Sequence, residues 1–498
     1  MVRLRAAVIL AAAALAGAVH SAAQENASQS AAPRFEDAPC PFKANENALA
    51  QIRCGYLTVP ENRAHPERGQ LKLAVAIARS VNATARPDPV VLLSGGPGQS
   101  IVSETPRLMN VMGVLRADRD VIIWDQRGTG LSEPAFCPEL SARWREIQAR
   151  RLAPSDRIKL QREAVADCRT RLLKQGVDLS QYHTVVTTHD LDDLRRALGV
   201  TQWNLMAVSY GTRVALEAMR PTPAGTRSIR SAVLTSPLPP NPPIDGREAF
   251  ADVVRRISRA CAAQPDCDAA YPEVERSLWA GMQELEEKPV VRRLPDGREQ
   301  VTDGNRLLQA VREATRSRRS LALVPMIIGE FRRRNEAIIA ALSRQMTGSV
   351  TSRVGRISRG LNLAVGCHDF RGTAEAQHSP TPDILDIGVF ERDESICDAL
   401  HTFRAGRQAP VVSDIPALLL TGEFDVVTHR SYGPAAARTL RNSQVVEAPG
   451  AGHGEGMGEE CTRGIVRDFI ANPLAKVDTN CLSTMTLRFV TDVRMIGQ

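Results

Sequence analysis

The sequence predicts an α/β protein with a mostly parallel sheet flanked by helices, and two observations carry this prediction. Short apolar runs that do not alternate with polar residues recur along the chain, as strands buried on both faces require; they cover residues 89–93, 120–124, 203–208, 231–235 and 415–420. Helix-like segments lie between them, such as 190–198, where Leu191, Leu194 and Leu198 share one face. Strands that alternate with helices in this way are typical of a parallel sheet.

The run at 203–208 ends directly in a serine, and a helix-like run follows it without a gap. Ala207, Ser209 and Gly211 form a small-X-Ser-X-Gly turn, which is the pattern of the nucleophile elbow in α/β-hydrolases. The residues two positions either side of the serine must be small, because strand and helix pass closely there. Ala207 stands where glycine is more usual, which adds a single methyl group. An ordinary strand-to-helix turn would carry the same residues, so the motif needs partners elsewhere in the chain.

Two such partners follow later apolar strands. Asp425 comes just after the strand at 415–420, and His453 lies in a glycine-rich loop one helix and one strand later. α/β-Hydrolases carry their triad in the order Ser, Asp, His, at the carboxyl ends of strands. His429 is the competing histidine, but it lies so close to Asp425 in sequence that it would be hard to present to the serine. The sequence therefore predicts the catalytic triad Ser209, Asp425 and His453.

The glycine-rich segment SGGPGQS follows the apolar run at 89–93. Glycines let backbone N–H groups approach a ligand closely, and hydrolases of this fold place half of the oxyanion hole at this point. We therefore expect the backbone N–H groups of Gly96 and Tyr210 to stabilise the oxyanion. In DQRGTGLS, which follows 120–124, we expect the Asp, Arg and Ser to fix a tight turn rather than to do chemistry. This chemistry needs no cofactor, and the cysteine spacing gives no zinc-like CxxC pair, so no metal site is expected.

Residues 239–409 are predicted as a helical cap inserted into the hydrolase core. The proline-rich segment SPLPPNPP ends the preceding strand, and arginine-rich, helix-like segments then replace the buried strands. The cap divides the predicted core into 39–238 and 410–498, and the second part includes a C-terminal tail. The runs at 55–59 and 71–77 are expected to pair antiparallel at the edge of the sheet.

The first 23 residues have the pattern of a secretory signal peptide. Arg3 and Arg5 precede a continuous apolar run at 6–19, and small residues then supply a cleavage site. Fourteen apolar residues fall short of the roughly 20 needed to span a bilayer, and no other run is long enough. We therefore expect an exported protein, periplasmic or secreted, without a membrane anchor. The polar residues 24–38 are expected to form a disordered lead.

Export makes the ten cysteines informative, because an even number in an oxidising compartment suggests disulfides. Sequence alone does not fix the connectivity, and free buried thiols are the alternative. We expect five pairs of sequence neighbours: Cys40 with Cys54, Cys137 with Cys168, Cys261 with Cys267, Cys367 with Cys397 and Cys461 with Cys481.

The formal net charge of +7 falls to +5 when the two signal-peptide arginines are removed (7 − 2). That excess is small for a chain of this length, and acidic residues are interleaved throughout. No basic stripe with interleaved aromatic residues is present, so the sequence does not favour nucleic-acid binding.

Five motifs, taken together, resemble those of the prolyl aminopeptidases and the secreted tripeptidyl aminopeptidases. They are SGGPG, DQRGTGLS, AVSYG, GEFDVVT and GAGH, in this order. The exported members also carry a long helical cap, and AVGCHD at 364–369 resembles a motif of that cap. Ser94 stands where prolyl aminopeptidases usually have histidine, which favours the tripeptidyl-like branch.

The resemblance implies an exported serine aminopeptidase whose partner is a peptide with a free N-terminus. Such an enzyme needs an acidic group to face the substrate's amine; Glu423 and Glu455 lie close in sequence to the triad, and the cap offers many more. Two alternatives stay open at this point. The same triad serves carboxylesterases and lipases, because fold does not fix function, and a hydrolase scaffold can also act as a binding module without catalysis.

Overall fold

The computed structural model describes residues 33–150, 152–221, 228–293, 299–341, 357–370, 394–401 and 408–495. The predicted signal peptide, most of the predicted lead and parts of the predicted cap lie outside these ranges. Within them, no helix combines the length and the apolar character needed to cross a bilayer.

The centre of the molecule is a nine-stranded sheet in the order β1-β2-β3-β5-β4-β6-β7-β10-β11. Strands β5, β4, β6, β7, β10 and β11 are parallel, whereas β1, β2 and β3 join antiparallel at one edge. The strands are β1 (Arg34–Asp37), β2 (Ile52–Pro60), β3 (Gln70–Ala78), β4 (Val90–Leu93), β5 (Val121–Trp124), β6 (Trp203–Val208), β7 (Ile229–Thr235), β10 (Ala417–Gly422) and β11 (Ser443–Ala448). The predicted α/β architecture is confirmed.

One segment differs from the sequence prediction. Residues 34–37 were expected in a disordered lead, but they form β1 and pair with β2 along its outer edge. Phe35 packs against the main apolar cluster, and the Asp37 carboxylate accepts a hydrogen bond of 2.6 Å from Arg53. Without β1, β2 would present an open edge of unpaired backbone groups, so pairing outweighs the polar character of the segment.

Helices cover both faces of the sheet, which explains why its central strands lack alternation. In β4, Val91 and Leu93 face the cluster formed with α7 and α8, while Val90 and Leu92 face the cluster formed with α3, α4 and α19. All four side chains are buried. The covering helices are α3 (Thr105–Val111), α4 (Gly113–Arg116), α7 (Thr184–Ala197), α8 (Tyr210–Ala218), α18 (Tyr432–Ala437) and α19 (Glu460–Ala471), and a short α2 (Glu46–Leu49) precedes β2.

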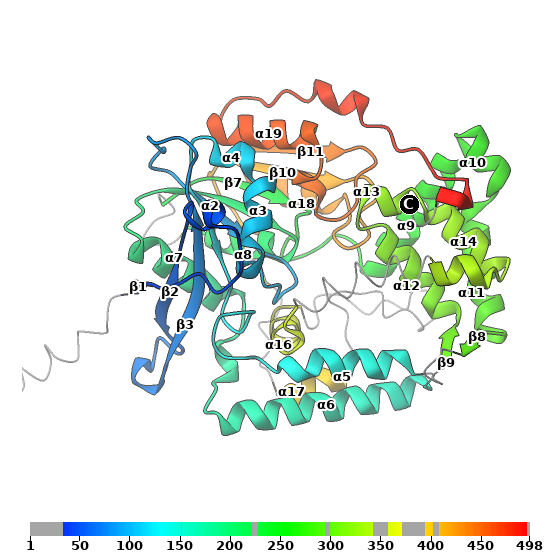
Figure 1. Cartoon of the computed structure of the whole chain (residues 1–498), viewed down its shortest axis with the longest axis horizontal. Coiled ribbons are helices and arrows are strands. Elements are labelled where there is room, and N and C mark those ends of the chain that lie inside the picture. Colours follow the sequence, from blue (N-terminus) through cyan, green and yellow to red (C-terminus); the bar gives the residue numbers. More distant parts are fainter. Residues whose placement is uncertain are drawn as a thin grey trace, which may run out of the picture.

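The helices between β7 and β10 divide between two apolar clusters. The first group lies beside the sheet, at the right of Figure 1, and packs around its own core, with Phe250, Leu278 and Ile327 fully buried. It contains α9 (Gly246–Ala262), α10 (Pro265–Ala270), α11 (Val274–Glu287), α12 (Gly304–Ala314), α13 (Arg318–Leu321), α14 (Val324–Arg332) and a hairpin of β8 (Val290–Arg293) and β9 (Glu299–Thr302). The sequence predicts helices and no buried parallel strands there, and the antiparallel hairpin is an addition to that prediction. We call this group the α9–α14 cap.

The second group packs into the apolar cluster on the face of the sheet that α7 and α8 cover. Helix α16 (Arg359–Asp369) and helix α17 (Glu394–Leu400) contribute Leu361, Val365 and Leu400 to the cluster that contains the central strands. They pack against α5 (Pro138–Ala149) and α6 (Pro154–Lys174), which lie together along the bottom of Figure 1. Helix α16 therefore packs with the central sheet and with α5 and α17, and it lies within the segment 239–409 that the sequence predicts as a cap.

All ten cysteines pair as sequence neighbours: Cys40–Cys54, Cys137–Cys168, Cys261–Cys267, Cys367–Cys397 and Cys461–Cys481. After Cys481 the C-terminal tail crosses from the sheet to the α9–α14 cap, as the red trace of Figure 1 shows. There Phe489 is buried in the cap cluster, and Val490 N–H donates to the Ala322 carbonyl at 2.9 Å. The tail thus ties the cap to the core.

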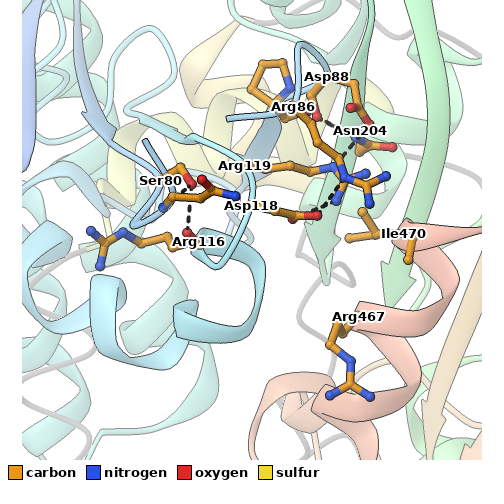
Figure 2. A network of polar contacts seen from close by, with 12 residues as sticks. Ser80, Arg86, Asp88, Arg116, Asp118, Arg119, Asn204, Arg467 and Ile470 are labelled. Atoms are coloured by element: carbon orange, nitrogen blue, oxygen red, sulfur yellow. Dashed lines mark hydrogen bonds and ion pairs between the residues drawn. The ribbon is translucent and has the colours of Figure 1, made fainter. Parts of the chain in front are cut away.

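Polar side chains lock the amino-terminal ends of the parallel strands together (Figure 2). The Asn204 side-chain amide donates to the backbone and side chain of Asp88, each at 2.9 Å, and Arg119 donates to the same carboxylate at 3.1 Å. Arg230 joins Asn204 to the Ile470 carbonyl. These contacts join the starts of neighbouring strands, so this end of the sheet has a structural role.

Candidate active site

Ser209 stands on a strained turn between β6 and α8. Its φ of 56° and ψ of −126° lie in a region that non-glycine residues rarely occupy and that clusters at functional sites. A Cβ atom at Gly211 would lie 2.0 Å from the Leu93 carbonyl oxygen, and one at Gly95 would lie 2.9 Å from the Ser209 Cβ. Only glycine fits at either position, so the steric reason given for the elbow pattern holds in this fold.

Asp425 and His453 lie side by side on the loops after β10 and β11. The Nδ1 atom of His453 is 3.0 and 2.9 Å from the two carboxylate oxygens of Asp425. Asp425 is fully buried, and it also accepts hydrogen bonds from the Val427 and Thr428 N–H groups and the Thr428 hydroxyl. Burial acts to raise the pKa of Asp425, but His453, the Thr428 N–H group and the Ser236 hydroxyl outweigh it and hold that pKa below its usual value. The carboxylate therefore stays ionised beside the imidazole.

The loop that carries His453 lies against the nucleophile elbow. A Cβ atom at Gly454 would be 3.3 Å from the Val208 side chain, and the Gly454 N–H donates to the Ser236 hydroxyl at 2.8 Å. The hydroxyl of Ser209 has no hydrogen-bond partner among the described residues, and its side chain is almost fully buried. In ligand-free hydrolases the bond between nucleophile and base often tightens only when substrate binds.

The two residues expected to form the oxyanion hole are sequence neighbours of groups at the Ser209 turn: Gly96 follows Gly95, and Tyr210 follows Ser209 itself. Gly96 follows β4 with a φ of +111°, and the neighbouring Gly95 abuts the Ser209 side chain. Tyr210 begins α8, so its N–H belongs to the first turn, where backbone donors have no partner within the helix.

The competing histidine is engaged elsewhere. His429 Nε2 lies 3.0 Å from a carboxylate oxygen of Asp252 on α9, and its Nδ1 lies 2.9 Å from the Ser431 hydroxyl. Both ring nitrogens therefore bond groups outside the Asp425–His453 pair. His429 joins the α9–α14 cap to the loop after β10.

The polar residues of DQRGTGLS have structural roles, as the sequence analysis expected. Asp125 is buried and accepts from the Ile101, Val102 and Leu131 N–H groups and from the Ser100 hydroxyl. Arg127 is equally buried and forms a two-bond ion pair with Asp190 on α7, at 2.6 and 2.7 Å.

Both glutamates suggested for the substrate's amine accept hydrogen bonds from backbone N–H groups. Glu423 accepts from the Gly450 N–H at 2.8 Å. Glu455 accepts from Gly452 at 2.6 Å and from Arg318, on α13 of the cap, at 2.8 Å. Burial raises the pKa of Glu455. Both carboxylates hold the loop around His453 in place.

His183, His368 and Asp369 form a cluster whose potential metal-ligand atoms lie within 4.8 Å of one another. The two imidazole rings stack face to face, with centroids 4.1 Å apart and planes 9° apart. A shared metal should lie in the plane of each ring, and two parallel stacked rings have no such common point. Asp369 also spends its oxygens on His368 and on Thr184. The described cluster is therefore a stacked pair of imidazoles in which His368 bonds Asp369 and the buried Nδ1 of His183 has no hydrogen-bond partner among the described residues.

Sequence reasoning missed the contacts that this cluster makes. Through Thr184, Asp369 reaches the phenol of Tyr210, the residue that follows the nucleophile. The segment AVGCHD resembles a cap motif of the exported aminopeptidases, but no spacing in the sequence links it to residues 184 and 210.

Comparison with known proteins shows what the chain resembles. A family model described as "alpha/beta hydrolase fold" matches residues 88–275, and one described as "TAP-like protein" matches residues 390–481. A tripeptidyl aminopeptidase of Streptomyces lividans is 33% identical over 178 residues, which is 34% of this chain and 33% of that protein. The serine protease Hip1 of Mycobacterium tuberculosis is 26% identical over 231 residues, which is 43% of this chain and 42% of that protein.

Among solved structures, the chain is similar to the proline iminopeptidase of Mycobacterium smegmatis, with 16% sequence identity and a TM-score of 0.41. The match covers 84% of this chain and 98% of the iminopeptidase chain. The chain matches less than half of the length of the curated relatives named above.

The sheet, the strained Ser209 turn and the matched region of 88–275 show that this chain has an α/β-hydrolase fold. Within that class, the TAP-like match and the peptidase relatives support the peptidase family that the sequence motifs indicated, and an enzyme of the serine hydrolase type.

Proposed function

We propose that this chain is an exported serine aminopeptidase that releases short N-terminal fragments from peptides through Ser209, Asp425 and His453. The observation that carries the proposal is the double contact of His453 Nδ1 with the buried Asp425 carboxylate, on a loop that abuts the strained Ser209 turn. The similarity to tripeptidyl aminopeptidases supports the substrate class. The five disulfides support export.

The chemistry follows from these groups. Because Nδ1–H of His453 donates to Asp425, Nε2 is unprotonated and can take the hydroxyl proton of Ser209. The Ser209 Oγ then bonds to the scissile carbonyl carbon, and the N–H groups of Gly96 and Tyr210 stabilise the oxyanion. His453 returns the proton to the leaving amine, and an acyl-enzyme remains. Water, deprotonated by His453, releases the acyl fragment and restores Ser209.

An aminopeptidase must also accommodate the positive N-terminus of its substrate, since an unpaired buried charge is costly. Glu455 accepts backbone N–H groups at both of its carboxylate oxygens, and Glu423 accepts one at a single oxygen. We propose that at least one acidic group of the cap faces the amine.

A panel of chromogenic substrates tests the proposal. Free-amine mono-, di- and tripeptide anilides are compared with their N-acetylated forms and with simple esters. We expect acetylated peptides to be cleaved at least tenfold more slowly, which corresponds to about 1.4 kcal/mol of transition-state binding. Equal turnover of free and acetylated peptides would exclude an aminopeptidase, and turnover of esters alone would identify an esterase.

A further inference from the structure

Helix α16 contacts both segments that carry the proposed oxyanion donors. At its amino-terminal end, the buried Asn362 side chain donates to the Pro97 carbonyl at 3.1 Å. Just before the helix, Ser358 N–H donates to the Gly98 carbonyl at 2.8 Å. The loop that follows Gly96 is thus held at two consecutive carbonyl positions by one element.

At its other end, α16 reaches the residue after the nucleophile. The Asp369 carboxylate accepts the Thr184 N–H at 3.1 Å and also the Thr184 hydroxyl. An ionised carboxylate can only accept hydrogen bonds, so the Thr184 hydroxyl donates to Asp369. The same hydroxyl then accepts a hydrogen bond from the Tyr210 phenol, 3.0 Å away. Asp369, Thr184 and Tyr210 are all buried. The hydrogen bonds that link these three residues are therefore shielded from water.

The helix between these two ends is a rigid spacer. Leu361, Leu363 and Val365 are buried in the main apolar cluster. The Cys367–Cys397 disulfide fastens α16 to α17. One rigid element therefore joins the loop after β4 to the start of α8.

We propose that Asn362 and Asp369 are positioning residues that set the spacing between the two oxyanion donors, the N–H groups of Gly96 and Tyr210. The inference rests on the proposed function and extends it, since neither residue touches substrate. Preorganised donors act on the charge that develops in the transition state, and a misplacement of about 1 Å can cost a hundredfold in rate. Loss of either tie should therefore lower kcat and leave KM nearly unchanged.

The test compares Asn362→Leu and Asp369→Asn with matched controls in the α9–α14 cap. Asn335→Leu removes an amide that bonds Glu330, and Asp303→Asn alters a carboxylate that caps α12. Active sites are first counted by fluorophosphonate titration, and kcat is expressed per titrated site. We expect a fall in kcat of at least tenfold for each α16 variant with KM within threefold, and control values within twofold of the wild type.

A second readout isolates the oxyanion hole. A tripeptide aldehyde forms a tetrahedral adduct with the serine, so its inhibition constant should rise by the same factor by which kcat/KM falls. Tyr210→Phe covers the case in which Asp369→Asn does not fold, because it removes one hydroxyl and leaves the Thr184–Asp369 bond intact; its kcat should fall in the same direction.

Three results would overturn the inference. Normal kcat per titrated site with fewer sites would show a role in folding only. A change confined to KM would show a role in substrate binding. If fluorophosphonate did not label the wild-type protein, that result would refute the proposed function and, with it, this inference.

Discussion

The Nδ1 atom of His453 lies 2.9 and 3.0 Å from the two carboxylate oxygens of Asp425, across loops that follow two neighbouring parallel strands. Asp425 accepts three further hydrogen bonds, from the Val427 and Thr428 N–H groups and the Thr428 hydroxyl. These bonds fix the orientation of the carboxylate independently of His453. The pair is therefore preorganised, and it favours the tautomer that His453 requires in its proposed role as the general base for Ser209.

We expect His453→Ala to abolish nearly all activity, by roughly 10⁴- to 10⁶-fold, as in other triads. His429→Gln should keep kcat within about tenfold, because His429 bonds Asp252 and Ser431. Steady-state kinetics on a free-amine tripeptide anilide gives both numbers. An inactive His429→Gln beside an active His453→Ala would reverse the histidine assignment.

Gly211→Ala should disrupt the elbow, because its Cβ would lie 2.0 Å from the Leu93 carbonyl oxygen. The matched control is Gly464→Ala in α19, where the added Cβ meets nothing within 4 Å. Alanine in a helix interior is favoured over glycine by roughly 0.5–1 kcal/mol. Thermal unfolding should therefore show a lower Tm for the first variant and an equal or higher Tm for the second. A Gly211→Ala protein with wild-type Tm and activity would contradict the close approach of β4 and α8.

The disulfides should differ in what they contribute to stability. In the loop-entropy description, a closed loop of 30 residues, as in Cys367–Cys397, is worth about 3.6 kcal/mol, and one of 6 residues, as in Cys261–Cys267, about 2.2 kcal/mol. We expect the Cys367→Ser/Cys397→Ser protein to be the less stable of the two paired variants in denaturant unfolding. Non-reducing peptide mapping checks the pairing itself; a long-range pair such as Cys54 with Cys461 would refute it.

The tie between Asp252 and His429 should make the attachment of the cap sensitive to acid. Burial acts to raise the pKa of Asp252, but hydrogen bonds from Arg256 and His429 outweigh it and lower that pKa to about 2. An unfolded aspartate titrates near 3.9. A depressed pKa contributes stability that is complete above about pH 4 and is lost as pH falls towards 2. The Tm difference between wild type and Asp252→Asn should thus be full at pH 6 and shrink at pH 2.5. A constant difference would show that the ionised Asp252 contributes nothing.

The sequence could predict what depends on neighbours along the chain. The elbow pattern around Ser209, the glycine-rich loops and the apolar strands are local signals, and they place β6, β7 and β10 correctly. The order of the proposed triad follows from the same signals, because parallel strands bring their carboxyl ends to one edge.

Contacts between distant segments could not be predicted in this way. Asp369 and Thr184 are 185 positions apart, and Asp252 and His429 are 177 apart, so only the packing of the described helices brings them together. The hairpin of β8 and β9 was missed because VVRR and EQVT show no apolar alternation. Strand β1 was missed because its own sequence is polar. It forms a strand by pairing with the edge of β2.

The central claim is that Ser209 is the nucleophile, and covalent labelling tests it most directly. Folded protein is treated with a fluorophosphonate, digested and mapped by mass spectrometry, while hydrolysis of a free-amine tripeptide anilide is followed in the same sample. We expect a single adduct, on the peptide that contains Ser209, activity that falls in step with labelling, and no adduct in His453→Ala. An active protein that carries no adduct at Ser209, or that loses activity through an adduct on another serine, would contradict the account.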